Sequence, residues 1–142
     1  MSKPYTPVKL PKNYKPRPRE KYMNAKQLEY FRLKLVAWRQ SLVEESQQTL
    51  ENMRGQQPQG GDDAERASRE TEISFELRTR DRYRKLLKKI DEALARIEEG
   101  EYGYCEETGE PIGIGRLEAR PIATLSVEAQ ERREKLERQY GD

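Results

Sequence analysis

Apolar residues between positions 24 and 53 recur at alternating spacings of three and four, and the positions between them are mostly polar. This period places the apolar side chains on one narrow stripe of an α-helix, as in the heptads of coiled coils. Neither proline nor glycine interrupts the segment. The pattern therefore predicts one continuous helix of about 45 Å, at a rise of about 1.5 Å per residue. The stripe consists of Leu28, Phe31, Leu35, Trp38 and Leu42.

A second segment, residues 64–99, repeats the pattern and ends before Gly100, a typical residue at a helix stop. Its stripe consists of Tyr83, Leu87, Ile90, Leu94 and Ile97. Two long helices that each carry one apolar stripe, joined by a short polar loop, form an antiparallel hairpin. We therefore expect a mainly α fold, with a long antiparallel coiled-coil hairpin and a small globular base. Four stripe residues are expected to face one another: Trp38, Leu42, Tyr83 and Leu87.

The loop that joins the two helices is rich in Gln, Gly and Pro, which marks a turn, and both stripes lose apolar residues towards it. We place the tip of the hairpin near residues 55–67. Asp62 and Glu65 stand at the start of the second helix, at the positions of an N-cap and its capping-box partner. Capping alone explains both acids, and it leaves a second role at an exposed tip open.

The helical period ends at residue 101, and glycines and prolines then break the chain into turns. This knuckle segment (residues 101–125) and the residues just after it have the spacing of a C-x2-C…C-x2-C zinc site. Its four positions are occupied by Cys105, Thr108, Ser126 and Ala129. A structural zinc ion needs four ligands, normally thiolate or imidazole, whereas alanine cannot ligate and neutral hydroxyls are poor ligands. We therefore predict no metal here, and interpret Cys105 as a small, partly buried hydrophobic residue. Ser126 is expected to cap a short C-terminal helix.

Composition narrows the function further. Of the 142 residues, 38% are charged and 33% are hydrophobic, which together with the periodicity indicates exposed helices rather than a thick core. The chain has no histidine and one cysteine, so it lacks the commonest general base, and an enzyme is the less favoured interpretation. No apolar run approaches the roughly 20 residues that span a bilayer, and no secretory signal is visible, so we expect a cytoplasmic protein.

The net charge of +2 hides strong local segregation. Residues 1–21 hold seven Lys or Arg, one Glu and five of the eight prolines, so residues 1–22 are predicted to form a basic extended arm that cannot order itself. A solubilising tail is at least as good an account of this arm as a binding role. The chain thus divides into the arm (1–22), the hairpin (23–100), and the knuckle segment with the C-terminal helix (101–142).

A basic stripe follows the second helix beside its apolar stripe, at spacings of four, three and four: Arg78, Arg82, Lys85 and Lys89. Such a stripe is usually a solvated face that pairs with glutamates, and each pair contributes a few tenths of a kcal/mol. Contact with an acidic surface or a phosphate ligand is the alternative. Spacing alone favours the solvated face.

Four separated blocks of sequence carry a resemblance to a known family. They are "AWRQSL" (37–42), the loop "DDAERA" (62–67), "SFELRTRDRYRKLLKKI" (74–90), and "YGYC" followed by "IGIGRLEARPIATL" (102–125). In this order and spacing they resemble the DksA/TraR family of bacterial transcription regulators, from Met23 onward. The resemblance implies a protein that binds RNA polymerase rather than DNA, and that inserts its coiled coil into the secondary channel of the enzyme. With the alarmone ppGpp, such proteins destabilise open complexes in the stringent response, repressing ribosomal RNA promoters and activating some biosynthetic promoters.

The resemblance also implies roles for particular residues. The tip motif D-x-x-D-x-A corresponds to Asp62, Glu65 and Ala67, where the second acid is one methylene longer than in the family. Contacts to ppGpp and polymerase are implied for Leu86, Lys89 and Arg120, together with Arg82 of the basic stripe. Gln130 stands where the family often has lysine, so one basic contact to phosphate is missing. No cofactor is expected besides ppGpp as a co-regulator, and the self-satisfied hairpin favours a monomer.

Two other functions are weighed against this one. A transcript-cleavage stimulator like the Gre factors would also carry acids at a coiled-coil tip, although the C-terminal blocks resemble DksA. The third function is direct DNA binding through the arm. A net charge of only +2 and the altered knuckle argue against it. Without zinc, the knuckle segment needs another source of stability. Our hypothesis is packing among Tyr102, Tyr104, Ile112, Leu117 and Leu125.

Overall fold

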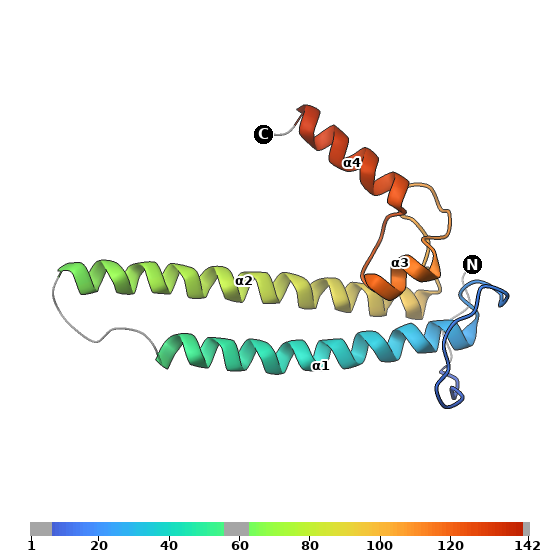
Figure 1. The fold of residues 1–142 in the computed structure, drawn as a ribbon, viewed down its shortest axis with the longest axis horizontal. Coiled ribbons are helices and arrows are strands. Elements are labelled where there is room, and N and C mark those ends of the chain that lie inside the picture. The colour runs from blue at the N-terminus through green and yellow to red at the C-terminus, as the bar shows by residue number, and fades with distance from the viewer. Residues whose placement is uncertain (1–6, 56–62, 141–142) are drawn as a thin grey trace. The chain divides into compact units, whose positions relative to one another are not determined.

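The computed structural model describes residues 7–55 and 63–140. Four helices follow one another along the chain: α1 (Ala25–Gly55), α2 (Asp63–Glu99), α3 (Ile114–Ala119) and α4 (Val127–Tyr140) (Figure 1). The predicted mainly α hairpin fold is confirmed, and both long helices end within two residues of their predicted bounds. None of the described helices is long and apolar enough to cross a membrane. Asp62, with most of the loop, lies outside the described residues.

The chain forms two compact units, and α1 and α2 each run through both. The hairpin unit comprises Val36–Asp91, and the base unit comprises the residues up to Leu35 and from Glu92 onward. Each unit has its own buried residues.

In the hairpin unit, α1 and α2 lie side by side and antiparallel (Figure 1). Among the described residues, three side-chain hydrogen-bonded pairs join them: Arg39 Nε donates to Asp91 at 2.7 Å, the hydroxyls of Thr49 and Tyr83 are 3.3 Å apart, and Arg54 Nε donates to Glu76 at 3.1 Å. Burial is sparse, because only Leu42, Thr79 and Ile90 are buried among the described residues of this unit. Polar contacts between the two helices therefore hold the hairpin as much as the packing of its apolar stripes does.

The register of the hairpin differs from the one we expected. Tyr83 meets Thr49, which lies eleven residues beyond Trp38 on α1, or about 16 Å along the helix. Trp38 and Tyr83 therefore do not face one another. A heptad stripe keeps its apolar face after a slip of whole heptads, so the stripes alone leave the register open.

The base unit has the thicker core. Phe31 and Leu35 of α1 and Ile97 of α2 are fully buried. The Tyr102 ring packs on Phe31 with centroids 5.7 Å apart, and its hydroxyl donates to Pro121 O at 2.7 Å. From α3, Leu117 is also fully buried, and Glu118 forms a 3.0 Å ion pair with Lys34.

The packing hypothesis for the knuckle segment is confirmed for four of its five residues. Tyr102, Ile112, Leu117 and Leu125 are all buried. Tyr104 is the exception, since 38% of it is exposed. Its ring instead meets the ring of Tyr22 edge to face, at 5.5 Å.

The described part of the arm is anchored, which corrects the expectation of an arm without ordering contacts. Tyr14 packs edge to face on Tyr30 at 6.2 Å. The hydroxyl of Tyr22 donates to Gly103 O at 2.7 Å and accepts from Gly113 N at 2.9 Å. Composition misled us because the arm has few aliphatic residues, whereas tyrosine supplies both a ring to bury and a hydroxyl to bond.

Gly103 shows how closely the arm approaches the knuckle segment. Its φ is +95°, and a Cβ built at this position would lie 2.8 Å from Cγ of Met23. No larger residue fits here without displacing Met23, and the positive φ itself favours glycine. The arm and the knuckle segment thus form one packed surface.

We expect Tyr22→Phe to lower the free energy of unfolding by about 1–3 kcal/mol, because it leaves Gly113 N without its acceptor while the ring contact stays. Urea unfolding followed by circular dichroism measures the change. Tyr140→Phe, at a residue that is 85% exposed, is the matched control and should leave the midpoint unchanged. An unchanged midpoint for Tyr22→Phe would show that the arm does not brace the knuckle segment.

Candidate functional site

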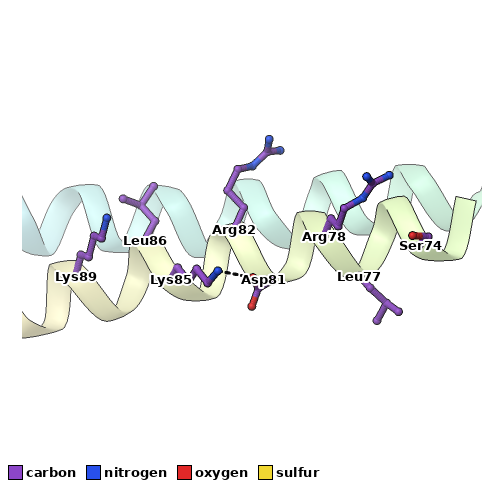
Figure 2. A pocket seen from close by; sticks show the side chains of 8 residues that line it. All are labelled: Ser74, Leu77, Arg78, Asp81, Arg82, Lys85, Leu86 and Lys89. Carbon is purple, nitrogen blue, oxygen red and sulfur yellow. Dashed lines mark ion pairs between the residues drawn. The ribbon is translucent and has the colours of Figure 1, made fainter. Parts of the chain in front are cut away.

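An open groove follows one face of α2 within the hairpin unit (Figure 2). Its volume is about 660 Å³. Residues three and four apart on a helix share a face, which explains how one helix lines the whole groove. The lining residues are Ser74, Leu77, Arg78, Asp81, Arg82, Lys85, Leu86 and Lys89.

The charges in this groove are only partly balanced. Asp81 forms ion pairs with Lys85 at 2.9 Å and with Arg84 at 2.6 Å. Hydrogen bonds from Lys85 and then Arg84 lower the pKa of the Asp81 carboxyl, so it remains an anion that neutralises Lys85. Among the described residues, the other cations of the groove have no ion-pair partner: Arg78, Arg82 and Lys89.

The basic stripe is therefore partly a charge-paired helix face, and its contact with an acidic surface or a phosphate ligand stays a prediction. Lys85 is paired, although along its own helix rather than across the hairpin. Figure 2 shows Arg82, Leu86 and Lys89 extending to the same side of α2, so an apolar side chain lies between two cations. That combination suits a ligand that carries both a negative charge and an apolar surface.

The structure brings together three of the four predicted contact residues: Arg82, Leu86 and Lys89. Arg120 belongs to the base unit, where it follows α3 and its N–H donates to Arg116 O at 2.7 Å. Our sequence reasoning missed Ser74, Leu77 and Asp81 as lining residues. Extending the basic stripe from Arg78 back by four positions reaches Ser74 and would have found it.

Two of the three tip residues can be located. Glu65 lies in the first turn of α2 and is half-buried, and Ala67 follows it on the exposed surface. The Ala67 carbonyl accepts a hydrogen bond from the Thr71 hydroxyl at 3.1 Å. Because Asp62 lies outside the described residues, the expected capping box stays a prediction.

In the base unit, the knuckle segment folds around Cys105. The Cys105 N–H donates to Glu110 O at 2.8 Å, and its carbonyl accepts from Gly109 N at 2.9 Å, which closes a tight turn. Thr108 lies in this turn and is exposed. Ser126 Oγ accepts from Ala129 N at 3.2 Å, so the predicted cap of α4 is confirmed, and Ala129 is fully buried.

The Cys105 thiol is buried but surrounded by donors. Burial raises its pKa, and hydrogen bonds from the Ser126 N–H, the Thr108 hydroxyl and N–H, and the Glu107 N–H outweigh this effect. The pKa falls to about 6. Cys105 is buried, as our interpretation of it as a small hydrophobic residue predicted, and the hydrogen-bond donors around its sulfur also favour the thiolate.

The donor set at this position does not fit a structural zinc ion. One thiol, two hydroxyls and a methyl group replace the four thiolate or imidazole ligands that zinc takes. Across residues 7–55 and 63–140, no group of three or more His, Cys, Asp or Glu side chains is placed to hold a metal. At these positions, hydrogen-bond donors from Ser126 and Thr108 surround the Cys105 sulfur.

Comparison with protein families gives two matches, one to each part of the chain. Residues 27–97 match the N-terminal domain of the DnaK suppressor protein DksA, and residues 100–135 match the prokaryotic dksA/traR C4-type zinc finger. The chain belongs to the DksA family. It is a family member that keeps one cysteine of the four-cysteine finger for which its second domain is named.

Individual relatives agree with this assignment. The RNA polymerase-binding transcription factor DksA of Caulobacter vibrioides (strain NA1000 / CB15N) is 56% identical over 130 residues, which cover 92% of each chain. The DksA of Escherichia coli K12 is 45% identical over 128 residues, covering 90% of this chain and 85% of the relative. Among solved structures, transcription factor DksA2 from Pseudomonas aeruginosa matches with a TM-score of 0.69 at 47% identity, covering 82% of this chain and 90% of that one.

Ionisation of Cys105 makes stability depend on pH. The folded pKa of about 6 lies below that of an unfolded thiol, about 8.5, so the folded state binds fewer protons between these values. The thiolate therefore stabilises the fold fully above about pH 8.5, and this contribution is lost as pH falls through 6.

We expect the stability advantage of the native DksA-family chain over Cys105→Ser to grow from pH 5.5 to pH 9, by the order of 1 kcal/mol or more. Urea unfolding at several pH values, with reductant present, measures it. Thr108→Val removes one donor and should flatten the pH dependence. A difference that does not change with pH would mean that the thiol stays neutral.

Proposed function

We propose that this DksA-family chain is a transcription regulator that binds RNA polymerase directly and acts in the cytoplasm without catalysing a reaction. The observation that carries the proposal is the similarity, over about nine-tenths of the chain, to relatives named as RNA polymerase-binding transcription factors. These matches favour DksA over a Gre-like cleavage stimulator. The slender hairpin supports the proposal, because it buries little of its own surface and leaves its polar faces available to a partner.

In the proposed mechanism the hairpin inserts into the secondary channel of polymerase. The acids Asp62 and Glu65, with Ala67, act at the tip near the catalytic centre and destabilise open complexes. A hairpin suits this role because its two helices brace one another along their length. Ion pairs such as Arg54–Glu76, near the end of α1, keep the polar half of the hairpin together.

The α2 groove is the proposed contact for ppGpp at the polymerase surface. The unpaired cations Arg82 and Lys89 would bind phosphate, and Leu86 between them would meet an apolar surface. Arg120 enters this proposal through the family resemblance alone. Gln130 offers no charge, so we expect a weaker response to ppGpp than in relatives that have lysine there.

The protein is proposed to act as a metal-free monomer that does not bind DNA sequence-specifically. Support for the metal-free state is the donor set of the knuckle segment. We expect elemental analysis of the purified, folded protein to find no stoichiometric zinc, and chelator treatment to leave its circular dichroism unchanged. One bound zinc per chain would contradict this.

The tip mechanism is tested by transcription in vitro from a ribosomal RNA promoter, with and without ppGpp. We expect the native chain to repress with ppGpp, and Asp62→Asn to bind polymerase with similar affinity but to lose most of the repression. Lack of polymerase binding by the native chain would refute the proposed function. Repression by Asp62→Asn equal to that of the native chain would refute the role of the tip.

The groove is tested by the double variant Arg82→Ala/Lys89→Ala. We expect half-maximal repression to need about tenfold more ppGpp, which corresponds to a loss of about 1.4 kcal/mol. Lys88→Ala removes an exposed cation from α2 outside the groove and is the matched control. An equal response from the double variant and the control would place the ppGpp contact elsewhere.

A further inference from the structure

The arm and the start of α1 enclose a second hollow, within the base unit. Its volume is about 650 Å³. Four basic side chains line it: Lys12, Lys15 and Arg17 from the arm, and Lys26 from α1. The groove on α2 lies in the other unit and shares no residue with it.

The backbone that carries these cations is held in place. Tyr14 N donates to Pro11 O at 3.2 Å and Glu20 N donates to Arg17 O at 3.1 Å, so two turns shape the rim. The Tyr14 hydroxyl donates to Glu20 at 2.6 Å and ties the turns together. Because the rim is already ordered, a partner that binds here loses less conformational entropy than it would on a loose tail.

The single acid of the hollow balances only part of its charge, because it stands against four cations. Glu20 accepts from three uncharged donors: the Tyr14 hydroxyl, the Asn24 amide at 3.1 Å and the Arg17 backbone N–H at 3.1 Å. These hydrogen bonds, and then the nearby charge of Arg17, lower the pKa of its carboxyl. None of the four lining cations forms an ion pair with another described residue, whereas Arg39, Arg54 and Arg80 on the long helices are paired. Cations held around one hollow repel one another, and an anionic partner removes that repulsion.

The chemistry of the lining favours carboxylates over nucleic acid. The four cations attract any anion, and lysine binds carboxylate and phosphate alike as a point charge, so the choice between the two depends on the rest of the lining. Single-stranded nucleic acid also needs exposed aromatic faces for stacking. The one aromatic residue of the lining, Tyr14, is engaged with Tyr30 and Glu20.

We propose that the hollow lined by Lys12, Lys15, Arg17 and Lys26 docks an acidic polypeptide segment on the surface of RNA polymerase. This second contact rests on the proposed function for the identity of the partner. It is separate from the hairpin in both position and task, because it adds affinity and the tip changes the open complex. A contact of this kind is expected to speed association and to weaken with salt.

The test uses the triple variant Lys12→Gln/Lys15→Gln/Lys26→Gln in the full chain. Its control, Lys9→Gln/Arg19→Gln/Lys21→Gln, removes the same number of charges from the arm outside the hollow. Affinity for purified polymerase is measured at low and high salt. We expect the hollow variant to bind about tenfold more weakly at low salt, a gap that shrinks at high salt, while the control stays close to the native chain.

Other outcomes separate the two proposals. Native binding by the hollow variant, or equal weakening by both variants, would overturn the docking site and leave the proposed function standing. No polymerase binding by the native chain would overturn both. Titration with single-stranded RNA and duplex DNA completes the test: a loss of nucleic-acid binding by the hollow variant, with polymerase affinity unchanged, would identify nucleic acid as the occupant and refute an acidic polypeptide.

Discussion

Each long helix of this protein has a single apolar stripe, and the two stripes can leave water only by packing on each other. In the base unit this pairing buries Phe31, Leu35 and Ile97 completely, and Tyr102 and Leu117 of the base join the same core. In the hairpin unit the stripe thins, and polar contacts such as Thr49–Tyr83 and Arg54–Glu76 continue the pairing. The remaining faces of the helices carry most of the charged side chains together with exposed apolar ones such as Phe75 and Leu77, and for this reason α2 can present a groove that is both charged and apolar.

Several contacts hold the knuckle segment, which matches the dksA/traR C4-type zinc finger but has one of its four cysteines. Hydrogen bonds surround the Cys105 sulfur, Ser126 caps α4, and Ala129 fills the core where a fourth ligand would stand. On the arm side, the Tyr22 hydroxyl bridges Gly103 and Gly113. Each of these hydrogen bonds contributes about 1 kcal/mol, so the stability of the segment is spread over many contacts. Such a base responds gradually to a single lost contact, whereas a zinc site fails as a whole when its metal leaves.

Charge is distributed unevenly over a chain that is nearly neutral in sum. Cations on the long helices are often paired, as Arg39 is with Asp91 and Lys85 with Asp81. In two places, the groove on α2 and the hollow of the arm, several cations without an ion-pair partner among the described residues line one surface. Both places use helices or turns as a rigid support, which keeps the charges close despite their repulsion. This arrangement is typical of surfaces that wait for an anionic partner.

The sequence by itself determined both long helices, their pairing as a hairpin, the cap at Ser126 and the unsuitability of the knuckle for zinc, because each depends on local period or on residue chemistry. It also indicated from helical spacing that Arg82 and Lys89 share a face, whereas Leu86 entered through the family resemblance. Only the tertiary structure decided the register that joins Thr49 to Tyr83, the anchoring of the arm through Tyr14 and Tyr22, and the donors around Cys105. These features join residues far apart in the chain, and no local pattern encodes which distant partner a hydroxyl or a sulfur meets.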